Sequence, residues 1–203
     1  MSNNILKIVS SLNPQASTSH MLAREATMML QQHYPESTVT ERDTAIGLPA
    51  IDASWINAAY TPQDQRSSAQ QKTLKQSEQL IAELSQADEV IIAVPMYNFS
   101  LPTGLKSWID HVVRAGVTFT YQENGPVGLL KQKPVTLIIS SGGVEIDSAN
   151  DFVTPYLRHV LGFIGLTNVR VIAADAMNVD PQRALDKARQ QLQDWARHRT
   201  LAA

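Results

Sequence analysis

The stretch that decides the fold is Glu89-Val90-Ile91-Ile92-Ala93-Val94-Pro95-Met96-Tyr97-Asn98-Phe99-Ser100-Leu101-Pro102-Thr103-Gly104. After Glu89, its first part is a run of β-branched and small apolar residues, which is typical of a strand buried on both faces of a parallel sheet. Pro95 suits the end of such a strand because it has no amide hydrogen, and Pro102 suits the first turn of a helix because its φ is fixed. Met, Asn and two aromatic residues lie between the prolines, and they can hold a flat aromatic ligand. Ligands of open parallel sheets bind beyond the carboxyl ends of central strands, so we expect a binding loop here, although a packing loop would look similar.

The rest of the chain alternates between strand and helix patterns. Apolar runs predict five strands, at 5–9, 38–43, 89–94, 135–139 and 169–173. Helices are expected at about 20–33, at 68–86 with Ser67 as the cap, from 103 to about 113, at about 151–164, and from about 181 to 199. This alternation predicts an α/β fold with a doubly wound five-stranded parallel sheet, and the length of 203 residues suits a single domain over 1–203.

Two segments interrupt the alternation. Residues 117–128 contain the turn signal Asn124-Gly125 after an alternating run, which predicts a small hairpin insertion. Residues 44–65 are mixed and carry Gly47, Pro49 and Pro62, and we expect an ordered surface excursion with a short helix near Trp55.

Composition excludes several classes of function. Hydrophobic content of 43% and charged content of 18% indicate a compact globule, and the net charge of −2 gives no basic field for nucleic acid or an anionic membrane. The absence of cysteine excludes disulfides, thiolate catalysis and cysteine-ligated metals, and the five histidines show no metal-ligand spacing, so no metal site is expected. No segment approaches the roughly 20 apolar residues of a membrane span, and the first residues do not resemble a signal peptide, so we expect a cytoplasmic protein.

The loop after the first strand is rich in hydroxyl groups. The loop lacks the glycine patterns that bind nucleoside triphosphates and dinucleotides. Instead it has hydroxyl side chains ahead of a helix, at Ser10, Ser11, Ser17, Thr18 and Ser19, and it contains no Lys or Arg. Hydroxyls and backbone amides at a helix N-terminus can hold a phosphate, but Ser and Thr are also ordinary caps, and the residues alone favour neither interpretation.

The fourth strand ends in Ser140-Ser141-Gly142-Gly143. Paired glycines allow a backbone to approach a ligand closely, although a plain turn would also use them. In the flavodoxin-like strand order 2-1-3-4-5 the first, third and fourth strands are neighbours, so their three loops would converge on one ligand.

The motifs together resemble one enzyme family. Ser10-Ser11 followed by Ser17-Thr18-Ser19, Pro95-Met96-Tyr97-Asn98-Phe99, Arg114-Ala115-Gly116-Val117-Thr118-Phe119, Asn124-Gly125-Pro126, Ser140-Ser141-Gly142-Gly143 and Leu161-Gly162-Phe163-Ile164-Gly165 extend over nearly the whole chain. In these motifs the sequence resembles the FMN-dependent NADH-azoreductases, which are flavodoxin-like homodimers that also act as NAD(P)H:quinone oxidoreductases.

The resemblance implies a role for each motif. The FMN phosphate would be held by Ser11, Ser17, Thr18 and Ser19. The isoalloxazine ring would contact Met96, Tyr97, Asn98 and Phe99, with a backbone amide near Asn98 at flavin N5. Its pyrimidine end would be bordered by Ser140, Ser141, Gly142 and Gly143, and the site would be completed at a dimer interface by Phe119, Tyr121 and Phe163. Where some relatives have a histidine after the glycine pair, this chain has Glu145.

The implied activity is a two-step redox cycle that needs no catalytic side chain as a nucleophile. NADH, with NADPH as a possible substitute, would pass hydride to flavin N5, and a quinone or azo compound would then receive it. Cleavage of an azo bond to two amines takes two such cycles. The alternatives are a flavodoxin-type electron carrier, against which the small net charge of −2 argues, and a non-catalytic flavin-binding module.

Overall fold

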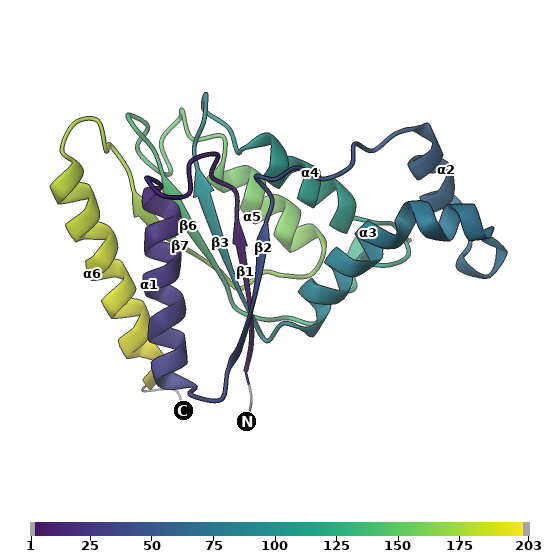
Figure 1. Cartoon of the computed structure of the whole chain (residues 1–203), viewed down its shortest axis with the longest axis horizontal. Helices are drawn as coiled ribbons and strands as arrows, with labels where there is room; N and C mark the ends of the chain where they lie inside the picture. Colours follow the sequence, from purple (N-terminus) through teal and green to yellow (C-terminus); the bar gives the residue numbers. More distant parts are fainter. Residues whose placement is uncertain (1–2, 201–203) are drawn as a thin grey trace.

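A computed structural model describes residues 3–200 of the chain, with side chains to 197. Its centre is a parallel sheet in the order β2-β1-β3-β6-β7 (Figure 1). The strands are β1 (Asn4–Val9), β2 (Thr38–Asp43), β3 (Glu89–Pro95), β6 (Val135–Ser140) and β7 (Val169–Ala174). Counted along the chain, these five strands have the order 2-1-3-4-5, so the predicted flavodoxin-like sheet is confirmed.

Helices cover both faces of the sheet (Figure 1). One face carries α1 (Thr18–His33) and α6 (Pro181–Thr200), and the other carries α3 (Ser68–Gln86), α4 (Thr103–Val112) and α5 (Thr154–Phe163). Ser67 caps α3 as predicted, in a capping box in which the Gln70 side chain accepts from the Ser67 amide. Two helices begin at other residues than expected. The Ser17 cap starts α1 at Thr18, two residues early, whereas Asp151 accepts the Val153 and Thr154 amides, so α5 starts only at Thr154.

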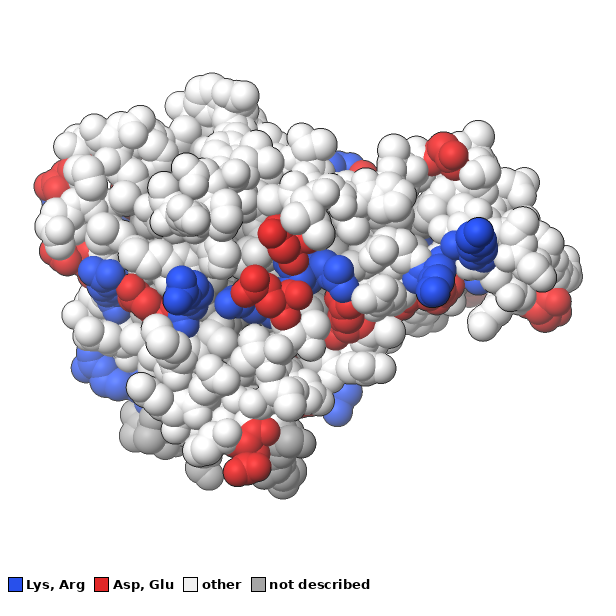
Figure 2. Space-filling model, viewed as in Figure 1, with Lys and Arg blue, Asp and Glu red and all other residues white. Residues whose placement is uncertain are grey.

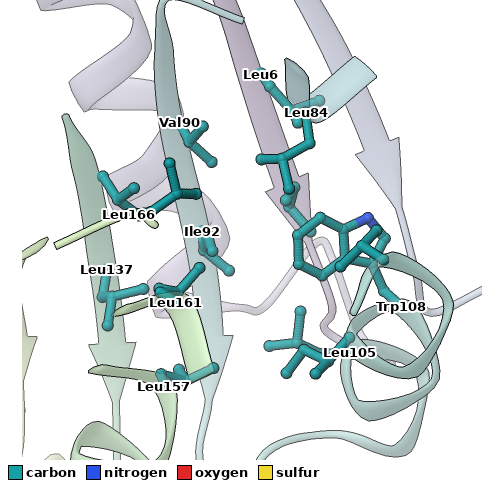
Figure 3. Packing of buried hydrophobic residues seen from close by; sticks show 14 of the residues in the cluster. Leu6, Leu84, Val90, Ile92, Leu105, Trp108, Leu137, Leu157, Leu161 and Leu166 are labelled. Carbon is teal, nitrogen blue, oxygen red and sulfur yellow. The ribbon is translucent and has the colours of Figure 1, made fainter. Parts of the chain in front are cut away.

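Strand β3 divides the core. All seven of its residues are buried, and its side chains point alternately to the two faces. Val90, Ile92 and Val94 belong to the cluster under α3, α4 and α5, of which Trp108 is the largest side chain (Figure 3), whereas Ile91 and Ala93 belong to the cluster under α1 and α6. Burial on both faces explains why the strand reads as a continuous apolar run.

The strand register brings the loops together. Val9 pairs with Ala93, Pro95 with Ser140, and Ser140 with Ala174. The carboxyl ends of β1, β3, β6 and β7 therefore lie level, and the loops that follow them emerge at one edge of the sheet.

The two irregular segments adopt the expected structures. The hairpin consists of β4 (Phe119–Gln122) and β5 (Gly125–Gly128), paired antiparallel. A Cβ atom at Gly128 would lie 2.1 Å from the Gly165 amide nitrogen, so the hairpin backbone lies directly against the chain after α5. The excursion forms α2 (Ala53–Tyr60) and a 3-10 turn (Gln63–Gln65), and Trp55 packs with Leu74 of α3. Among residues 3–200, no helix has the length and apolar character needed to span a bilayer.

Candidate functional site

A cavity of about 270 Å³ lies where the loops after β1, β3, β6 and β7 meet. Eight residues expected at the cofactor line it, namely Ser11, Ser17, Thr18, Met96, Tyr97, Ser140, Ser141 and Gly142. Asn13, Ala16, Pro95, Met177 and Asn178 complete the lining. The structure thus brings all three predicted loops to one place, although Ser19, Asn98, Phe99 and Gly143 lie outside the lining of this cavity.

The hydroxyl-rich loop ends at the N-terminus of α1. The Ser17 Oγ accepts a hydrogen bond from the His20 amide at 3.3 Å, so Ser17 is the helix cap. Its Oγ also lies 3.2 Å from the Oγ of Ser19, which is fully buried. No acidic side chain occupies the first turn of α1, and the positive end of the helix dipole faces a cavity lined by Ser17 and Thr18. Capping and anion binding are therefore compatible here, because the cap hydroxyl accepts from the helix, and its own hydrogen can point either to the Ser19 Oγ or to an anion in the cavity.

Tyr97 lies between the first and third loops. Its hydroxyl is 3.4 Å from the Oγ of Ser11, which in turn accepts a hydrogen bond from the Asn13 amide at 3.2 Å. The side chain of Tyr97 therefore reaches from the loop expected at the ring to the loop expected at the phosphate.

The loop after β3 contains a strained two-residue turn. Tyr97 and Ser100 exchange both backbone hydrogen bonds at 2.9 Å, and between them Asn98 and Phe99 have φ of 48° and 65°. Such a turn, with two positive φ values, is of type I′, which usually contains glycine. The Met96 amide donates to the Ser140 carbonyl at 2.8 Å and fixes this loop to the end of β6.

The loop after β6 lies against the loop after β7. The Met177 amide donates a hydrogen bond to the Ser141 carbonyl, and the Asn178 amide donates one to the Gly142 carbonyl. A Cβ atom at Gly142 would lie 2.6 Å from Asn178 Nδ2, whereas one at Gly143 would meet nothing within 4 Å. Gly142 thus permits close packing of the two loops, and Gly143 leaves open space above them.

Sequence reasoning missed the contribution of the fifth strand. Met177 and Asn178 follow β7 at the same edge as the predicted loops. The segment carries no glycine pair or hydroxyl cluster. The predicted strand order was the available signal, because it puts the end of the fifth strand beside the fourth.

Two buried carboxylates hold the segment 141–154 in place. Asp175 accepts from the Ile146 amide at 3.1 Å and from the Lys187 Nζ at 3.0 Å. Burial raises the pKa of Asp175, but these hydrogen bonds outweigh burial, and the pKa lies below its ordinary value. Asp151 accepts three backbone amides, which gives a structural role to a residue that had none assigned from the sequence. Glu145, which directly precedes the anchored Ile146, is exposed.

The three aromatic residues expected at the substrate lie together elsewhere. The ring centroid of Phe119 is 5.5 Å from that of Tyr121 and 4.4 Å from that of Phe163. Phe119 lines a different cavity, of about 840 Å³, with Trp55 and Arg114, and this cavity shares no lining residue with the one at Met96. Within one chain, the aromatic cluster and the convergent loops are thus separate.

Comparisons with known proteins identify the family of the chain. The flavodoxin-like fold family matches residues 3–198. An FMN-dependent NADH:quinone oxidoreductase 1 from Hahella chejuensis is 48% identical over 188 residues, covering 93% of this chain and 92% of that protein. A protein of the same name from a Jannaschia species is 44% identical over 193 residues, covering 95% and 98% of the two chains.

Solved structures share the fold. An azoreductase from Bacillus anthracis strain Sterne has a TM-score of 0.85 at 25% identity, covering 96% of this chain and 97% of that one. An FMN-dependent NADH-azoreductase from Bacillus anthracis strain Ames Ancestor, solved in complex with FMN, has a TM-score of 0.86 at 22% identity, covering 97% and 98% of the two chains. The chain therefore belongs to the flavodoxin-like family that includes the FMN-dependent NADH:quinone oxidoreductases and the azoreductases.

Proposed function

We propose that this protein is an FMN-dependent oxidoreductase that takes electrons from NADH and passes them to quinones or azo compounds. The observation that carries the proposal is the convergence of Ser11, Ser17, Met96, Tyr97 and Gly142 on one cavity at the carboxyl edge of the sheet. Relatives 48% and 44% identical over most of their length carry names with this activity.

The residues of the cavity suit a mononucleotide. Ser11, Ser17 and Thr18 would bind the phosphate with neutral donors, aided by the N-terminus of α1. Met96 and Tyr97 would lie against the ring, and the turn at Asn98 and Phe99 would present backbone amides to it. The backbone of 140–143 would border the far end of the ring, where Gly143 leaves space.

The chemistry that FMN supplies when bound is two-electron transfer from NADH to an oxidised acceptor. The chain's own residues bind and orient the partners of that reaction. Backbone amides of the loop after β3 would stabilise negative charge on the reduced ring, because donors fixed in advance need no rearrangement when charge develops. We assign no side chain as a nucleophile or as a general acid.

The substrate walls belong to the proposal as well. We propose a homodimer in which Phe119, Tyr121 and Phe163 of one chain complete the site of the other, because within one chain they line no cavity with Met96. We also propose that the enzyme works in the cytoplasm, where NADH is produced, and that NADPH can replace NADH.

An absorption spectrum tests the proposal. The purified protein, reconstituted with FMN, should be yellow, should bleach on anaerobic addition of NADH, and should regain its colour when a quinone is added. A protein that takes up no FMN would refute the whole proposal. Bound FMN that NADH does not bleach would instead indicate a flavin-binding module, and bleached FMN that only a protein partner reoxidises would indicate an electron carrier.

The phosphate site has its own test. Replacing Ser11 by alanine should weaken FMN binding by roughly ten- to a hundredfold, because a hydrogen bond to a charged group contributes about 1.5–3 kcal/mol. Fluorescence titration with FMN measures the change. Ser68→Ala is the matched control, since Ser68 is the exposed first residue of α3 and lies outside the cavity lining. Equal affinities of the two variants would contradict the assignment of Ser11.

A further inference from the structure

A second cavity, of about 600 Å³, adjoins the first on the other side of the loop after β3. The two cavities share Met96 and Tyr97 as walls, so a molecule held at one can extend into the other. The remaining apolar walls of the second cavity come from three loops, at Leu12, Ala45, Leu101 and Pro102. Its volume is within the range of small-molecule sites, which is roughly 300–1,000 Å³.

The loops that build this second cavity carry no charge. Segments 10–17, 44–51 and 95–104 contain no Lys, Arg, Asp or Glu, although these residues make up 18% of the chain. Figure 2 shows the same asymmetry, with charged side chains gathered in a band across the middle of the molecule and a largely uncharged upper edge. An ionised ligand group would find no opposite charge here and would lose its hydration.

The mouth of this cavity exposes an apolar side chain. Leu12 lines the cavity and is 74% exposed, whereas Phe99, which is 55% exposed, lies outside the lining and follows the lining residue Asn98 in the chain. Single exposed apolar residues are common on protein surfaces, but Leu12 belongs to the wall of an uncharged cavity that adjoins the proposed ring site. A hydrophobic ligand group would remove this side chain from water.

The wall at Ala45 is fixed by close packing. A Cβ atom at Gly104 would lie 2.0 Å from the Thr44 carbonyl oxygen, so the first turn of α4 lies directly on the segment that carries Ala45. The Thr44 amide and hydroxyl also bond to the Val9 carbonyl, at 2.8 and 3.1 Å. The start of the 44–65 excursion is therefore a rigid side of the cavity.

We propose that the second cavity receives the neutral hydrophobic substituent of the electron acceptor, an alkyl chain or an additional aryl ring, while the reducible part of the acceptor lies at the Met96–Tyr97 side. The inference rests on the proposed function, and it narrows the substrate class to acceptors that are uncharged on this substituent. Each methylene buried there raises affinity about fourfold, the equivalent of roughly 0.8 kcal/mol.

Matched quinones test this inference on the FMN-loaded enzyme. We compare one quinone ring bearing a methyl group, a neutral pentyl chain or a chain of similar length ending in a sulfonate. The wild-type kcat/KM for the pentyl quinone should exceed that for the methyl quinone by roughly tenfold, as burial of about two methylenes predicts, and the sulfonate should lose this gain. Thermal shift on adding each quinone without NADH gives a second readout that is independent of turnover.

Two variants locate the effect. Ala45→Asp puts a charge in the wall, and Ala45→Leu fills part of the hollow. Both should remove most of the roughly tenfold preference for the pentyl chain and leave the methyl quinone within about twofold of wild type, since only the chain is in contact. Ala50→Asp is the matched control, because Ala50 is exposed in the same segment and lies outside the cavity lining.

Several outcomes would overturn the inference. If both variants treat the two quinones alike, or if wild type shows no chain-length preference, the cavity does not hold the substituent. A loss of FMN affinity in the Ala45 variants would mean that the flavin itself fills the cavity, and a change in oligomeric state would mean that a second copy covers it. If wild type binds no FMN or oxidises no NADH with any quinone, the proposed function fails first and this inference fails with it.

Discussion

Asn98 and Phe99 both adopt the left-handed backbone conformation in the turn of the candidate site. Asn tolerates this region because its side chain is short and polar. For Phe, the close contact of Cβ with the backbone costs about 1–2 kcal/mol there. No helix or strand imposes the conformation, and the paired Tyr97 and Ser100 hydrogen bonds hold it. Strain of this kind is found at ligand-binding sites, where it fixes backbone amides before the ligand arrives.

A pair of substitutions at Phe99 isolates the strain. Phe99→Ala and Phe99→Gly remove the same ring contacts, but only glycine accepts a φ of 65° without cost. We therefore expect the glycine variant to be the more stable of the two by about 1 kcal/mol, the reverse of the usual order. Urea unfolding of the two FMN-free proteins measures the difference, and an alanine variant of equal or greater stability would show that the turn is unstrained.

Helix α4 illustrates packing at the scale of an element. Its second residue, Gly104, lies so close to the Thr44 carbonyl that a side chain there must displace backbone, whereas Gly162 in α5 has nothing within 4 Å of its would-be Cβ. The two glycines thus have opposite reasons for their presence. Gly104 is required by the contact between α4 and the excursion, and Gly162 is not required by any contact within the chain.

The same substitution should therefore have opposite effects at these positions. Ala is favoured over Gly within a helix by about 1 kcal/mol, so Gly162→Ala should stabilise the chain by a similar amount. Gly104→Ala should destabilise it by about 1–3 kcal/mol, because overpacking outweighs the helical preference. Thermal unfolding of both variants gives the comparison, and a stabilised Gly104→Ala variant would contradict the packing described here.

The elements also show how far sequence patterns reach. The buried strand 89–94, the cap at Ser67 and the hairpin of 117–128 could be predicted because each has a local cause in its own residues, although the hairpin turns at Glu123-Asn124, one residue before the expected Asn124-Gly125. The wall formed by Asn178 was missed, because its segment carries no local motif and only the strand order indicated it. The positive φ at Phe99 could not be predicted because no glycine stands at that position. The separation of Phe119 from Met96 could not be predicted either, because it depends on how distant elements pack.

On the scale of the whole molecule, the two core clusters meet at one sheet. Strands β1, β3 and β6 contribute side chains to both clusters, so neither layer of helices has a core of its own. We infer that the chain folds as a single domain. The site at the carboxyl edge then depends on both layers, since its loops lead into α1 and α6 on one face and into α4 and α5 on the other.

Asp175 connects the loop after β6 at the candidate site to helix α6, and its ionisation makes this connection depend on pH. The carboxylate ties the Ile146 amide in the loop after β6 to Lys187 on α6. Its folded-state pKa lies below the unfolded value of about 3.9, so the unfolded chain binds a proton more readily. The stabilisation is therefore complete above the unfolded pKa and is lost as the pH falls through the folded pKa.

Substitutions at this pair test the coupling. Asp175→Asn should lower stability at pH 7 by about 1–2 kcal/mol and flatten the fall in stability below about pH 4, because the titrating group is gone. Lys187→Met should also shrink that fall, since burial without an opposing charge raises the folded-state pKa of Asp175 towards its unfolded value, and the fall grows with the difference between the two. Urea unfolding between about pH 3 and 7 follows both variants. If Asp175→Asn kept the acid dependence of wild type, another carboxylate would carry it, and if its FMN affinity were unchanged, the loop after β6 would not need this anchor to hold the cofactor.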